Sequence, residues 1–302
     1  MDQYRGRYAP SPTGPLHFGS LVAAVGSYLE AKSRGGLWLL RMEDLDPPRE
    51  QPGAADAILR TLEACGMGWD GDIMYQSQRS AAYDAALARL EAQGLVYPCA
   101  CSRREIADSS LRHDGALIYP GTCRNGLAPG KTARAARVRV GDTLIEFEDA
   151  VQGTVRQNLA AEAGDFVLLR ADGLHAYQLA VVVDDAEQGV TDVVRGADLL
   201  DSTPRQIHLQ RLLGLRPPRY LHLPAAVNAA GEKLSKQTLA APVDARDPLP
   251  ALAQVLHFLG QAPPAQLGRA SLAEFWLWAL AHWDAQRIPR RHSLPAPCYE
   301  NG

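Results

Sequence analysis

The sequence begins with two segments of different periodicity, and a turn rich in proline and glycine separates them. Residues 5–9 form a short run that predicts a strand, and residues 18–33 place apolar side chains near helical spacing. Residues 34–36, Arg-Gly-Gly, end this helix, and the apolar run 37–42 predicts a buried strand. A strand, a long helix and a second strand form a βαβ unit, which builds parallel sheets with right-handed crossovers. The sequence therefore predicts an α/β fold with a parallel sheet.

The middle of the chain differs in character from this first unit. Residues 95–170 contain a cysteine cluster, many arginines and short alternating runs such as residues 136–140. They predict an inserted α+β module that splits the parallel-sheet domain into two halves. The apolar run 179–185 predicts that the sheet resumes, and residues 190–195 predict a further strand. We therefore expect the first half of the sheet domain at residues 1–80, the inserted module at 81–173 and the second half at 174–215. Residues 216–302 are expected to form a C-terminal part with a lysine loop and a short helical segment.

Helical signals recur between and after these strands. Thr203 precedes Pro204, a pair that predicts a helix start with a capping hydroxyl. Ser271 and Glu274 form a capping box before an apolar stripe, which we interpret as a packing face. The helices are expected at about residues 54–65, 80–94, 204–213, 248–259 and 272–287.

The turn after the first strand has the features of a phosphate site. In open parallel sheets, ligands bind at the carboxyl ends of the strands. The start of the next helix offers unpaired backbone N–H groups and the positive end of the helix dipole, which favour phosphate. Gly14 and Gly19 let a nucleotide approach the backbone closely, and His17 can donate a hydrogen bond to phosphate. Taken alone, however, such a turn is also common without a ligand.

Charge and composition restrict the classes of partner. The formal net charge is −3, so a nucleic-acid partner needs a local basic patch. Residues 195–236 contain seven Lys or Arg and three Asp or Glu, an excess that fits either RNA phosphates or a solvated face. The sequence shows no signal peptide and no run of eighteen apolar residues, so we expect a cytoplasmic protein without a membrane partner. In that reduced compartment, the five cysteines predict free thiols or a metal site instead of disulfides.

A second motif lies more than two hundred residues after the N-terminal turn. Residues 233–237, Lys-Leu-Ser-Lys-Gln, follow the flexible turn 228–231 and place two lysines three positions apart. Together with residues 17–20, His-Phe-Gly-Ser, they resemble the HIGH and KMSKS signatures of the class I aminoacyl-tRNA synthetases. Three residues depart from these signatures, namely Ser20, Leu234 and Gln237, whereas the essential His17, Gly19 and Lys236 are present.

Further motifs narrow the resemblance to the glutamyl-tRNA synthetases. They occur in the family's order at residues 7–14, 40–46, 75–79, 194–198 and 202–206. The resemblance covers about residues 5–240 and implies a class I synthetase Rossmann core. It assigns catalysis to His17 and Lys236. It assigns ATP binding to Pro10, Gly14, His17, Gly19, Ser20, Lys233 and Lys236.

The residues that the resemblance assigns to glutamate match the charges of that substrate. Arginine binds a carboxylate through two parallel hydrogen bonds, and Arg7 and Arg195 are expected at strand ends on the same edge of the sheet. Glu43 can pair with the ammonium group, while Ser11 and Tyr177 can donate hydrogen bonds. Any one of these residues alone would fit a surface ion pair or a packed tyrosine, so the assignment depends on the whole set.

The chain is shorter than the glutamyl-tRNA synthetases that it resembles. Only 65 residues follow Gln237, too few for the anticodon-binding domains of those enzymes. In this respect it resembles their truncated paralogues, which activate glutamate and attach it to the queuosine base in the anticodon of tRNA(Asp). The resemblance implies ATP with Mg²⁺ and a structural Zn²⁺ as cofactors, with glutamate, ATP and queuosine-containing tRNA(Asp) as partners. We expect activation without tRNA and a monomeric protein.

The clustered cysteines resemble the zinc site of these truncated paralogues. That resemblance implies Cys99, Cys101, Tyr119 and Cys123 as the ligands. Spacing alone instead favours His113 as the fourth ligand, because three thiolates and a histidine form a common tetrahedral zinc set. Tyrosine is a rare ligand, since its phenol ionises near pH ~10 unless a metal assists. Three free buried thiols are the remaining alternative.

Other functions stay open on the sequence alone. A shortened glutamyl-tRNA synthetase would charge tRNA(Glu), and the length of the chain argues against it. A non-catalytic paralogue would bind tRNA or glutamyl-adenylate, and the presence of His17, Lys236, Glu43 and Arg195 argues against that function. A ligase that transfers an amino acid to a small molecule is the third alternative.

Overall fold

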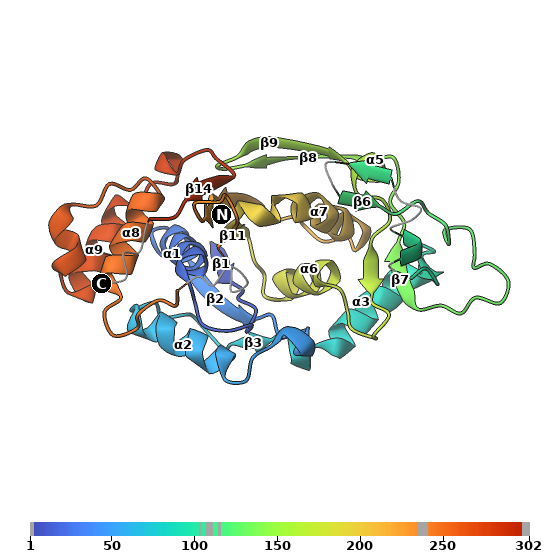
Figure 1. Ribbon diagram of the computed structural model, residues 1–302, viewed down its shortest axis with the longest axis horizontal. Coiled ribbons are helices and arrows are strands. Elements are labelled where there is room, and N and C mark those ends of the chain that lie inside the picture. The colour runs from blue at the N-terminus through green and yellow to red at the C-terminus, as the bar shows by residue number, and fades with distance from the viewer. Residues whose placement is uncertain (1–2, 103, 107–110, 114–115, 235–240, 298–302) are drawn as a thin grey trace.

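The computed structural model describes residues 3–102, 104–106, 111–113, 116–234 and 241–297. The molecule is elongated, and parallel strands occupy its middle (Figure 1). The C-terminal helices α8 (Leu249–Phe258) and α9 (Leu272–His282) lie at one end and β7 (Ala135–Val138) lies at the other, while strands β8 (Leu144–Asp149) and β9 (Gly153–Asn158) run along the middle. The parallel strands therefore lie between two flanking parts.

The first βαβ unit forms as the sequence predicts. Strand β1 (Arg5–Tyr8) pairs in parallel with β2 (Leu37–Met42), and helix α1 (Phe18–Lys32) connects them. The short strand β3 (Met74–Tyr75) extends this sheet in parallel on the far side of β2. Apolar side chains of α1 and β2 are buried together, which stabilises the crossover through the hydrophobic effect.

A second parallel pair continues the arrangement. Strand β11 (Asp192–Gly196) pairs with β12 (Arg219–Leu223), and α7 (Thr203–Leu212) connects them. The backbone nitrogen of Thr191 donates to the carbonyl oxygen of Arg5 at 3.0 Å, so β11 begins beside β1. The carboxyl ends of β1, β2 and β11 consequently open onto one edge of the molecule.

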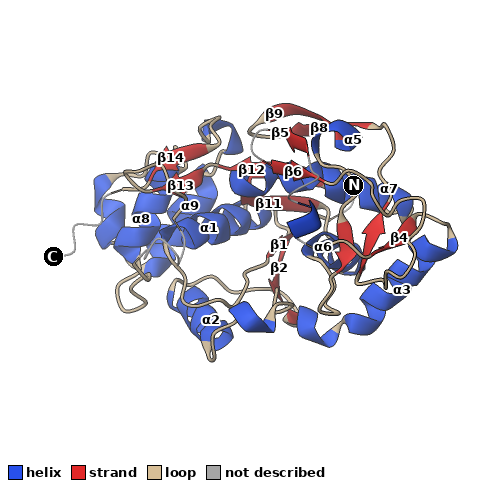
Figure 2. Cartoon of the chain, turned by 45° about the vertical axis from the view of Figure 1, so that its right-hand side comes forward, coloured by secondary structure: helices blue, strands red, loops and turns tan. Residues whose placement is uncertain are grey.

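The predicted insertion contains antiparallel strands, and one of its hairpins joins the parallel pair. Strand β8 (Leu144–Asp149) is antiparallel to β9 (Gly153–Asn158) and runs parallel to β12, with Asp149 opposite Tyr220. Figure 2 shows this hairpin alongside β12. A separate three-stranded antiparallel sheet and a two-stranded ribbon make up the rest of the strands described there. These are β4 (Val96–Cys99), β7 (Ala135–Val138) and β10 (Val167–Leu169), and the ribbon of β5 (Leu111–His113) with β6 (Ala116–Ile118).

The remaining helices pack around these sheets. The capping box of Ser271 and Glu274 is present, and Phe275, Trp276 and Ala279 are buried on the packing face that begins there. No described helix is long and apolar enough to cross a membrane. The remaining elements include α2 (Ala54–Ala64), α3 (Ser80–Ala92), α5 (Leu159–Glu162), α8 (Leu249–Phe258), α9 (Leu272–His282), and the parallel pair β13 (Ala225–Val227) and β14 (Ser293–Pro295).

The prediction that residues 179–185 form a strand is wrong. This segment belongs to helix α6 (Tyr177–Glu187), which packs between α3 and α7. A short run of buried apolar residues has no polar face, so its periodicity does not distinguish a strand from a buried helix. The helical twist sends Asp184 and Asp185 to different partners, namely Arg79 for the first and Arg7 and Arg41 for the second.

Two predicted helix ends also differ. Thr203 is the first residue of α7 and not its cap, and the residue before it, Ser202, makes no capping hydrogen bond through its side chain. The Thr203 hydroxyl instead contacts Arg195 and His222. Helix α9 ends at His282, whereas the sequence predicts a helix to residue 287, because the backbone of Trp283 is extended.

Candidate active site

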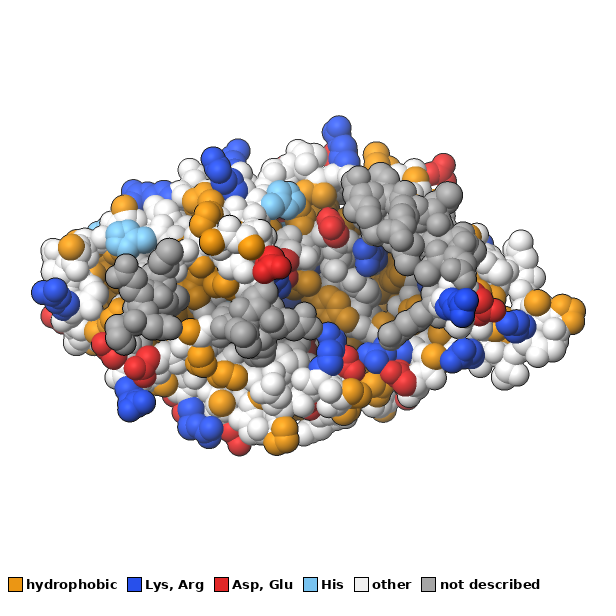
Figure 3. All heavy atoms as spheres, viewed as in Figure 1, with side chains coloured by type: hydrophobic (Ala, Val, Ile, Leu, Met, Phe, Trp, Pro, Cys, Tyr) orange, Lys and Arg blue, Asp and Glu red, His pale blue; other side chains and the backbone are white. Residues whose placement is uncertain are grey.

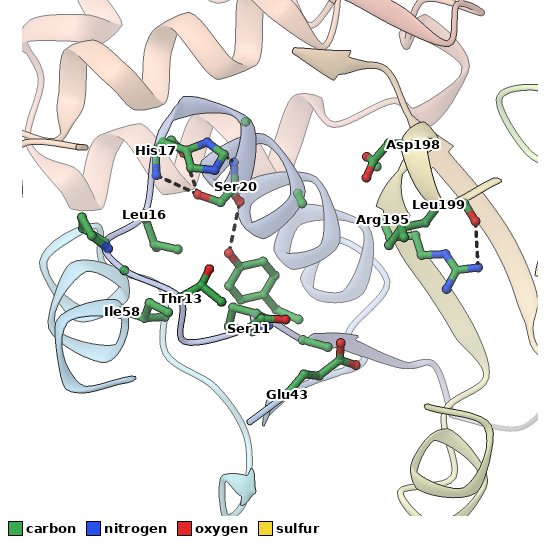
Figure 4. Close-up of a pocket in the computed structure, with 18 of the residues that line it drawn as sticks. Ser11, Thr13, Leu16, His17, Ser20, Glu43, Ile58, Arg195, Asp198 and Leu199 are labelled. Atoms are coloured by element: carbon green, nitrogen blue, oxygen red, sulfur yellow. Dashed lines mark hydrogen bonds between the residues drawn. The ribbon is translucent and has the colours of Figure 1, made fainter. Parts of the chain in front are cut away.

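A pocket of about 640 Å³ opens at the carboxyl ends of β1, β2 and β11. Figure 4 shows residues of the N-terminal turn, the start of α1, and strand β11 around it. Figure 3 shows side chains of both charges around a hollow near the middle of the face in view. The structure brings together in this pocket the predicted residues Arg7, Pro10, Ser11, Gly14, His17, Gly19, Ser20, Glu43, Tyr177, Arg195 and Lys233. Lys236 lies outside the described residues.

His17 caps helix α1 with its own ring. Its Nδ1 atom accepts from the backbone nitrogen of Ser20 at 3.3 Å, and the Ser20 hydroxyl is 2.8 Å from the backbone nitrogen of His17. Ser20, a departure from the family signature, thus completes a capping box. An Nδ1 atom that accepts a hydrogen bond leaves the proton of the neutral ring on Nε2. The neutral ring is therefore protonated on Nε2, which can donate a hydrogen bond to a ligand.

The lysine loop approaches the same helix start. A Cβ atom on Gly19 would lie 3.3 Å from the His17 ring and 3.6 Å from the carbonyl oxygen of Leu234, so glycine permits the close approach. The backbone nitrogen of Val243 donates to the carbonyl oxygen of Leu16 at 2.9 Å. The two motifs, separated by more than two hundred residues in sequence, are thus adjacent in space.

Lys233 forms an ion pair with Asp198, and both residues line the pocket. Asp198 follows strand β11, whereas Lys233 belongs to the lysine loop. The pair therefore links the loop to the end of β11 beside the turn that holds His17.

Buried charged residues lie near the carboxyl ends of β1 and β2. Asp185 accepts from Arg7 Nε at 3.1 Å and lies 2.7 Å from an Nη atom of Arg41, and Arg41 also lies 3.4 Å from Glu43. Although burial works in the opposite direction, Arg7 and Arg41 hold the pKa of Asp185 below its usual range. Burial raises the pKa of Glu43 above its ordinary value, despite the nearby Arg41 and Arg7. Asp185 therefore stays ionised at neutral pH, whereas Glu43 takes up a proton at a higher pH than an ordinary glutamate does.

Arg195 is held from several sides at the end of β11. One Nη atom donates to Tyr177 Oη at 3.3 Å, and the other donates to Thr203 Oγ1 at 2.8 Å and to the carbonyl oxygen of Leu199 at 3.4 Å (Figure 4 draws the Leu199 bond). The Nε atom donates to His222 Nε2 at 3.1 Å. Burial raises the pKa of Tyr177, so its hydroxyl keeps its proton. Arg195 and Tyr177 can therefore both donate to an acidic ligand in the pocket.

The charges of this site leave a positive excess. Four cationic side chains line the pocket, Arg7, Arg49, Arg195 and Lys233, against the two carboxylates of Glu43 and Asp198. Behind them Arg41 is matched by Asp185, and Asp149 offsets one further charge, so one positive charge is left over. In a poorly hydrated pocket an uncompensated positive charge favours an anionic ligand. The arrangement therefore favours an anionic ligand.

Sequence reasoning missed several residues that support the site. Arg41, Asp149, Asp185 and His222 are buried, but none was singled out for its chemistry. Arg41 and His222 are polar residues inside otherwise apolar strand runs, and this interruption is the sequence signal that could have revealed them. Asp149 has no such signal, because its partner lies 73 residues away.

The three clustered cysteines converge with Tyr119. Their Sγ atoms lie within 4.8 Å of one another, and those of Cys101 and Cys123 are 3.5 Å apart. Tyr119 Oη lies 3.5 Å from Cys99 Sγ and 3.6 Å from Cys101 Sγ. This group could hold a metal ion. The side chain of His113, which spacing alone favours as a ligand, lies outside what the structure describes.

Arg137 lies directly against this cluster. Its Nε atom is 3.4 Å from Cys99 Sγ, and its guanidinium carbon is 3.9 Å from the centre of the Tyr119 ring. Although burial opposes ionisation, hydrogen bonds from Tyr119 and Arg137 lower the pKa of Cys99. The environment of Cys99 therefore favours thiolate, the form that binds metals, whereas burial raises the pKa of Cys101 to about 11.

Comparison with known families agrees with this geometry. Residues 3–261 match the catalytic domain of the class I tRNA synthetases for E and Q, glutamate and glutamine. The chain therefore belongs to this family of class I tRNA synthetases. Within it, the chain groups with relatives named Glutamyl-Q tRNA(Asp) synthetase.

These relatives match almost the entire chain. The one from Aromatoleum aromaticum is 62% identical over 97% of this chain and 93% of its own length. The one from Chromobacterium violaceum is 61% identical over 95% of each chain, and that from Pseudomonas aeruginosa is 55% identical over 97% of each. The similarity is thus not confined to the catalytic motifs.

Solved structures support the same fold. The glutamate-tRNA synthetase from Elizabethkingia anophelis has a TM-score of 0.81 at 25% identity and covers 97% of this chain. The match takes in 68% of that longer protein. A glutamate tRNA ligase from Elizabethkingia meningosepticum has the same TM-score at 24% identity, which shows the shared fold.

Proposed function

We propose that this enzyme activates glutamate with ATP, without tRNA, and transfers it to the queuosine base in the anticodon of tRNA(Asp). The observation that carries the proposal is the near full-length identity of 55–62% to relatives named Glutamyl-Q tRNA(Asp) synthetase. The pocket supports it, because it joins buried arginines for an acidic substrate to a helix start that suits phosphate. Glutamate carries two carboxylates and one ammonium group, and its net charge complements the positive excess of the site.

The residues of the pocket divide into two groups. Arg7 and Arg195 bind the carboxylates of glutamate, and Glu43 pairs with its ammonium group. Ser11 and Tyr177 add hydrogen bonds. The pocket residues of the ATP site are Pro10, Gly14, His17, Gly19, Ser20 and Lys233. Lys236, which lies outside the described residues, belongs to the same proposed site. His17 and Lys236 stabilise the charge that develops on the phosphates.

The reaction proceeds in two transfers. An oxygen of the glutamate α-carboxylate forms a bond to the α-phosphorus of ATP, and pyrophosphate leaves. A hydroxyl of the queuosine ring then attacks the carbonyl carbon of glutamyl-adenylate, and AMP leaves. Mg²⁺ bound with ATP neutralises phosphate charge. His17 donates from Nε2 to the phosphate, since its Nδ1 atom is engaged by Ser20. No side chain of the protein becomes covalently attached to glutamate.

We also propose that the cysteine cluster binds a structural Zn²⁺. Tetrahedral ligands at about 2.3 Å from zinc lie about 3.8 Å apart, and an oxygen ligand shortens the edges slightly. The separations of 3.5 and 3.6 Å around Tyr119 and of 3.5 Å between Cys101 and Cys123 fit this geometry. Tyr119 therefore fits as the fourth ligand, with Cys99, Cys101 and Cys123 as the other three.

The acceptor is tested by charging assays with labelled glutamate. Three RNAs are compared, namely tRNA(Asp) with queuosine, tRNA(Asp) without it, and tRNA(Glu). The proposal requires label on the first alone, and removal of the 3′-terminal adenosine should not abolish it. Label on tRNA(Glu), with none on queuosine-containing tRNA(Asp), would instead identify a shortened glutamyl-tRNA synthetase. Absence of glutamate-dependent pyrophosphate exchange would identify a non-catalytic paralogue.

A further inference from the structure

A buried carboxylate and an imidazole lie behind the arginine of the glutamate site. Arg195 and His222 are register partners on the parallel strands β11 and β12, and Asp149 ends the adjoining strand β8. Asp149 is 4% exposed and His222 is fully buried. Neither residue lines the pocket. Their influence on a ligand must therefore pass through Arg195.

Asp149 is held in its ionised form. Its Oδ1 atom accepts from the backbone nitrogens of Val151 at 3.0 Å, Gln152 at 2.8 Å and His222 at 3.2 Å. Its Oδ2 atom lies 2.6 Å from His222 Nδ1. Burial works against ionisation, but these hydrogen bonds lower the pKa of Asp149. The carboxylate thus presents one fixed acceptor to the imidazole.

This carboxylate fixes the tautomer of His222. The proton lies on Nδ1, because Asp149 accepts there, and Nε2 is left as an acceptor. Nε2 faces Arg195 Nε at 3.1 Å and Thr203 Oγ1 at 3.2 Å. Arg195 carries only donors, so it can be held at Nε only by an acceptor. The other tautomer would place two N–H groups against each other.

The anchoring determines which donors of Arg195 face the ligand. His222 binds Nε–H, while Thr203 and Leu199 accept from one Nη atom. Among the described residues, the other Nη atom is hydrogen-bonded to Tyr177, a residue that lines the pocket. The guanidinium is thereby fixed at its Nε atom and at one of its two Nη atoms. Its remaining donor capacity is directed toward the site of the substrate carboxylate.

We propose that Asp149 and His222 are positioning residues for glutamate: the hydrogen-bond chain from Asp149 through His222 sets the orientation of Arg195. This inference rests on the proposed function, in which Arg195 binds a carboxylate of glutamate. It assigns the two residues to the affinity for glutamate and not to the chemistry of the phosphates.

Asp149→Asn tests the chain with little change in volume. The backbone nitrogens around Oδ1 hold the amide oxygen, so the amide nitrogen faces His222 Nδ1 as a donor. His222 must then carry its proton on Nε2, against Arg195 Nε–H. We expect the KM for glutamate in ATP–pyrophosphate exchange to rise about 10- to 100-fold. The KM for ATP should stay unchanged, and kcat should change less than about threefold.

A second aspartate–histidine pair, with an exposed aspartate, provides a control for the chemical change alone. Asp84 Oδ1 lies 3.0 Å from His175 Nε2, and neither residue lines the pocket. Asp84→Asn makes the same chemical change and should leave the KM for glutamate unaltered. An equal rise in both variants would overturn the inference, because the effect would then not depend on Arg195.

The tautomer can be measured directly in the unmodified protein. With ¹⁵N-labelled histidine, the NMR signal of His222 should show a proton on Nδ1 and an unprotonated Nε2 at neutral pH. His222→Gln identifies the signal. Asp149→Asn should move the proton to Nε2. A wild-type His222 protonated on Nε2 or on both nitrogens would overturn the inference, whether or not the Asn variant folds.

A combined variant separates this inference from the proposed function. On an Arg195→Ala background, Asp149→Asn should cause no further rise in the KM for glutamate. A rise of the same size as in the wild type would show that the pair does not act through Arg195. If Arg195→Ala itself leaves this KM unchanged, the proposed role of Arg195 fails. If Arg195→Ala raises it and Asp149→Asn does not, only the positioning role fails.

Discussion

The Nδ1 atom of His17 accepts a hydrogen bond from the backbone nitrogen of Ser20 at 3.3 Å. One side chain therefore caps α1 and, in the proposed mechanism, contacts phosphate with its other nitrogen. The Ser20 hydroxyl in turn accepts a hydrogen bond from the backbone nitrogen of His17 at 2.8 Å, which completes the capping box. The departure from the family signature at residue 20 consequently preserves the structure of the helix start.

Capping and catalysis by His17 can be separated with His17→Asn. Asparagine is a good helix cap, so the free energy of unfolding should change by less than about 1 kcal/mol. It has no group in the place of Nε2, and kcat for ATP–pyrophosphate exchange should fall about 10²- to 10³-fold. Ser20→Ala should show the reverse pattern, with a loss of about 0.5–2 kcal/mol in stability and a small effect on kcat. Near wild-type exchange in His17→Asn would exclude His17 from the chemistry.

Arg195→Ala should raise the KM for glutamate by one to three orders of magnitude. A charge-assisted hydrogen bond contributes roughly 1.5–3 kcal/mol, and the loss of a buried positive charge beside the substrate carboxylate adds to this cost. Glutamate-dependent pyrophosphate exchange measures the effect. Arg156→Ala is a suitable control, because Arg156 forms an exposed ion pair with Glu146 away from the pocket. An unchanged KM in Arg195→Ala would remove this residue from the substrate site.

Glu43 should connect glutamate binding to pH. Burial raises its pKa, so the carboxylate takes up a proton at a higher pH than an ordinary glutamate does. The protonated group cannot pair with the ammonium of the substrate. The KM for glutamate should therefore rise as the pH falls toward this raised pKa, and Glu43→Gln should have a high KM that varies less with pH.

The same pKa shift predicts the opposite effect on stability. A folded-state pKa above the unfolded value means that the unfolded chain releases the Glu43 proton more readily, so stability falls as the pH rises through this range. Glu43→Gln removes that penalty. Its Tm at neutral pH, without substrate, should be higher than that of the wild type, and thermal unfolding at several pH values measures the difference. A lower Tm would show that the pairing of Glu43 with Arg41 outweighs its burial.

Metal analysis should find about one zinc per chain in protein purified without a chelator. Cys101→Ala should lose the zinc and destabilise the segment around β4 and β7, because metal binding is coupled to local folding. Cys65→Ala is the control, since Cys65 is a buried thiol outside the cluster. Wild-type protein without zinc would falsify the metal site, and zinc retained in Cys101→Ala would exclude Cys101 as a ligand.

Glutamate activation should proceed without tRNA. Two arginines that line the pocket are already held from behind, Arg7 by Asp185 and Arg195 by His222, so their positions are fixed by the protein itself. Pyrophosphate exchange with glutamate, ATP and Mg²⁺ alone should therefore be measurable. Strict dependence on added tRNA would contradict this prediction.

The sequence was most informative where local chemistry and periodicity agree. The first βαβ unit follows from a strand run, a helical run and a second strand run, and it forms with a parallel register from Arg5 opposite Leu37 to Tyr8 opposite Leu40. The predicted pocket residues share short motifs, and the parallel topology brings their strand ends together. Local order in the sequence was therefore enough to identify this edge of the sheet.

The failures have physical causes. Residues 179–185 are buried on nearly every side, so the apolar–polar contrast that distinguishes a helix from a strand is missing. Thr203 has the sequence context of a cap, yet a buried guanidinium is a stronger competitor for its hydroxyl. The pairing of Asp149 with His222 depends on the register of β8 against β12, which no local spacing encodes.

The parallel contact of β8 with β12 affects how this protein can be redesigned. In chain order β8 comes between β7 and β10, which pair with each other in the sheet beside the cysteine cluster. Its last residue, Asp149, nevertheless contacts His222 behind the substrate pocket. A chimaera that exchanges residues 81–173 with those of a relative would also replace the carboxylate beneath His222. Such a graft should retain glutamate affinity only if the donor segment supplies an aspartate at the end of the same hairpin strand. The boundary for modular exchange is thus set by a single buried side chain.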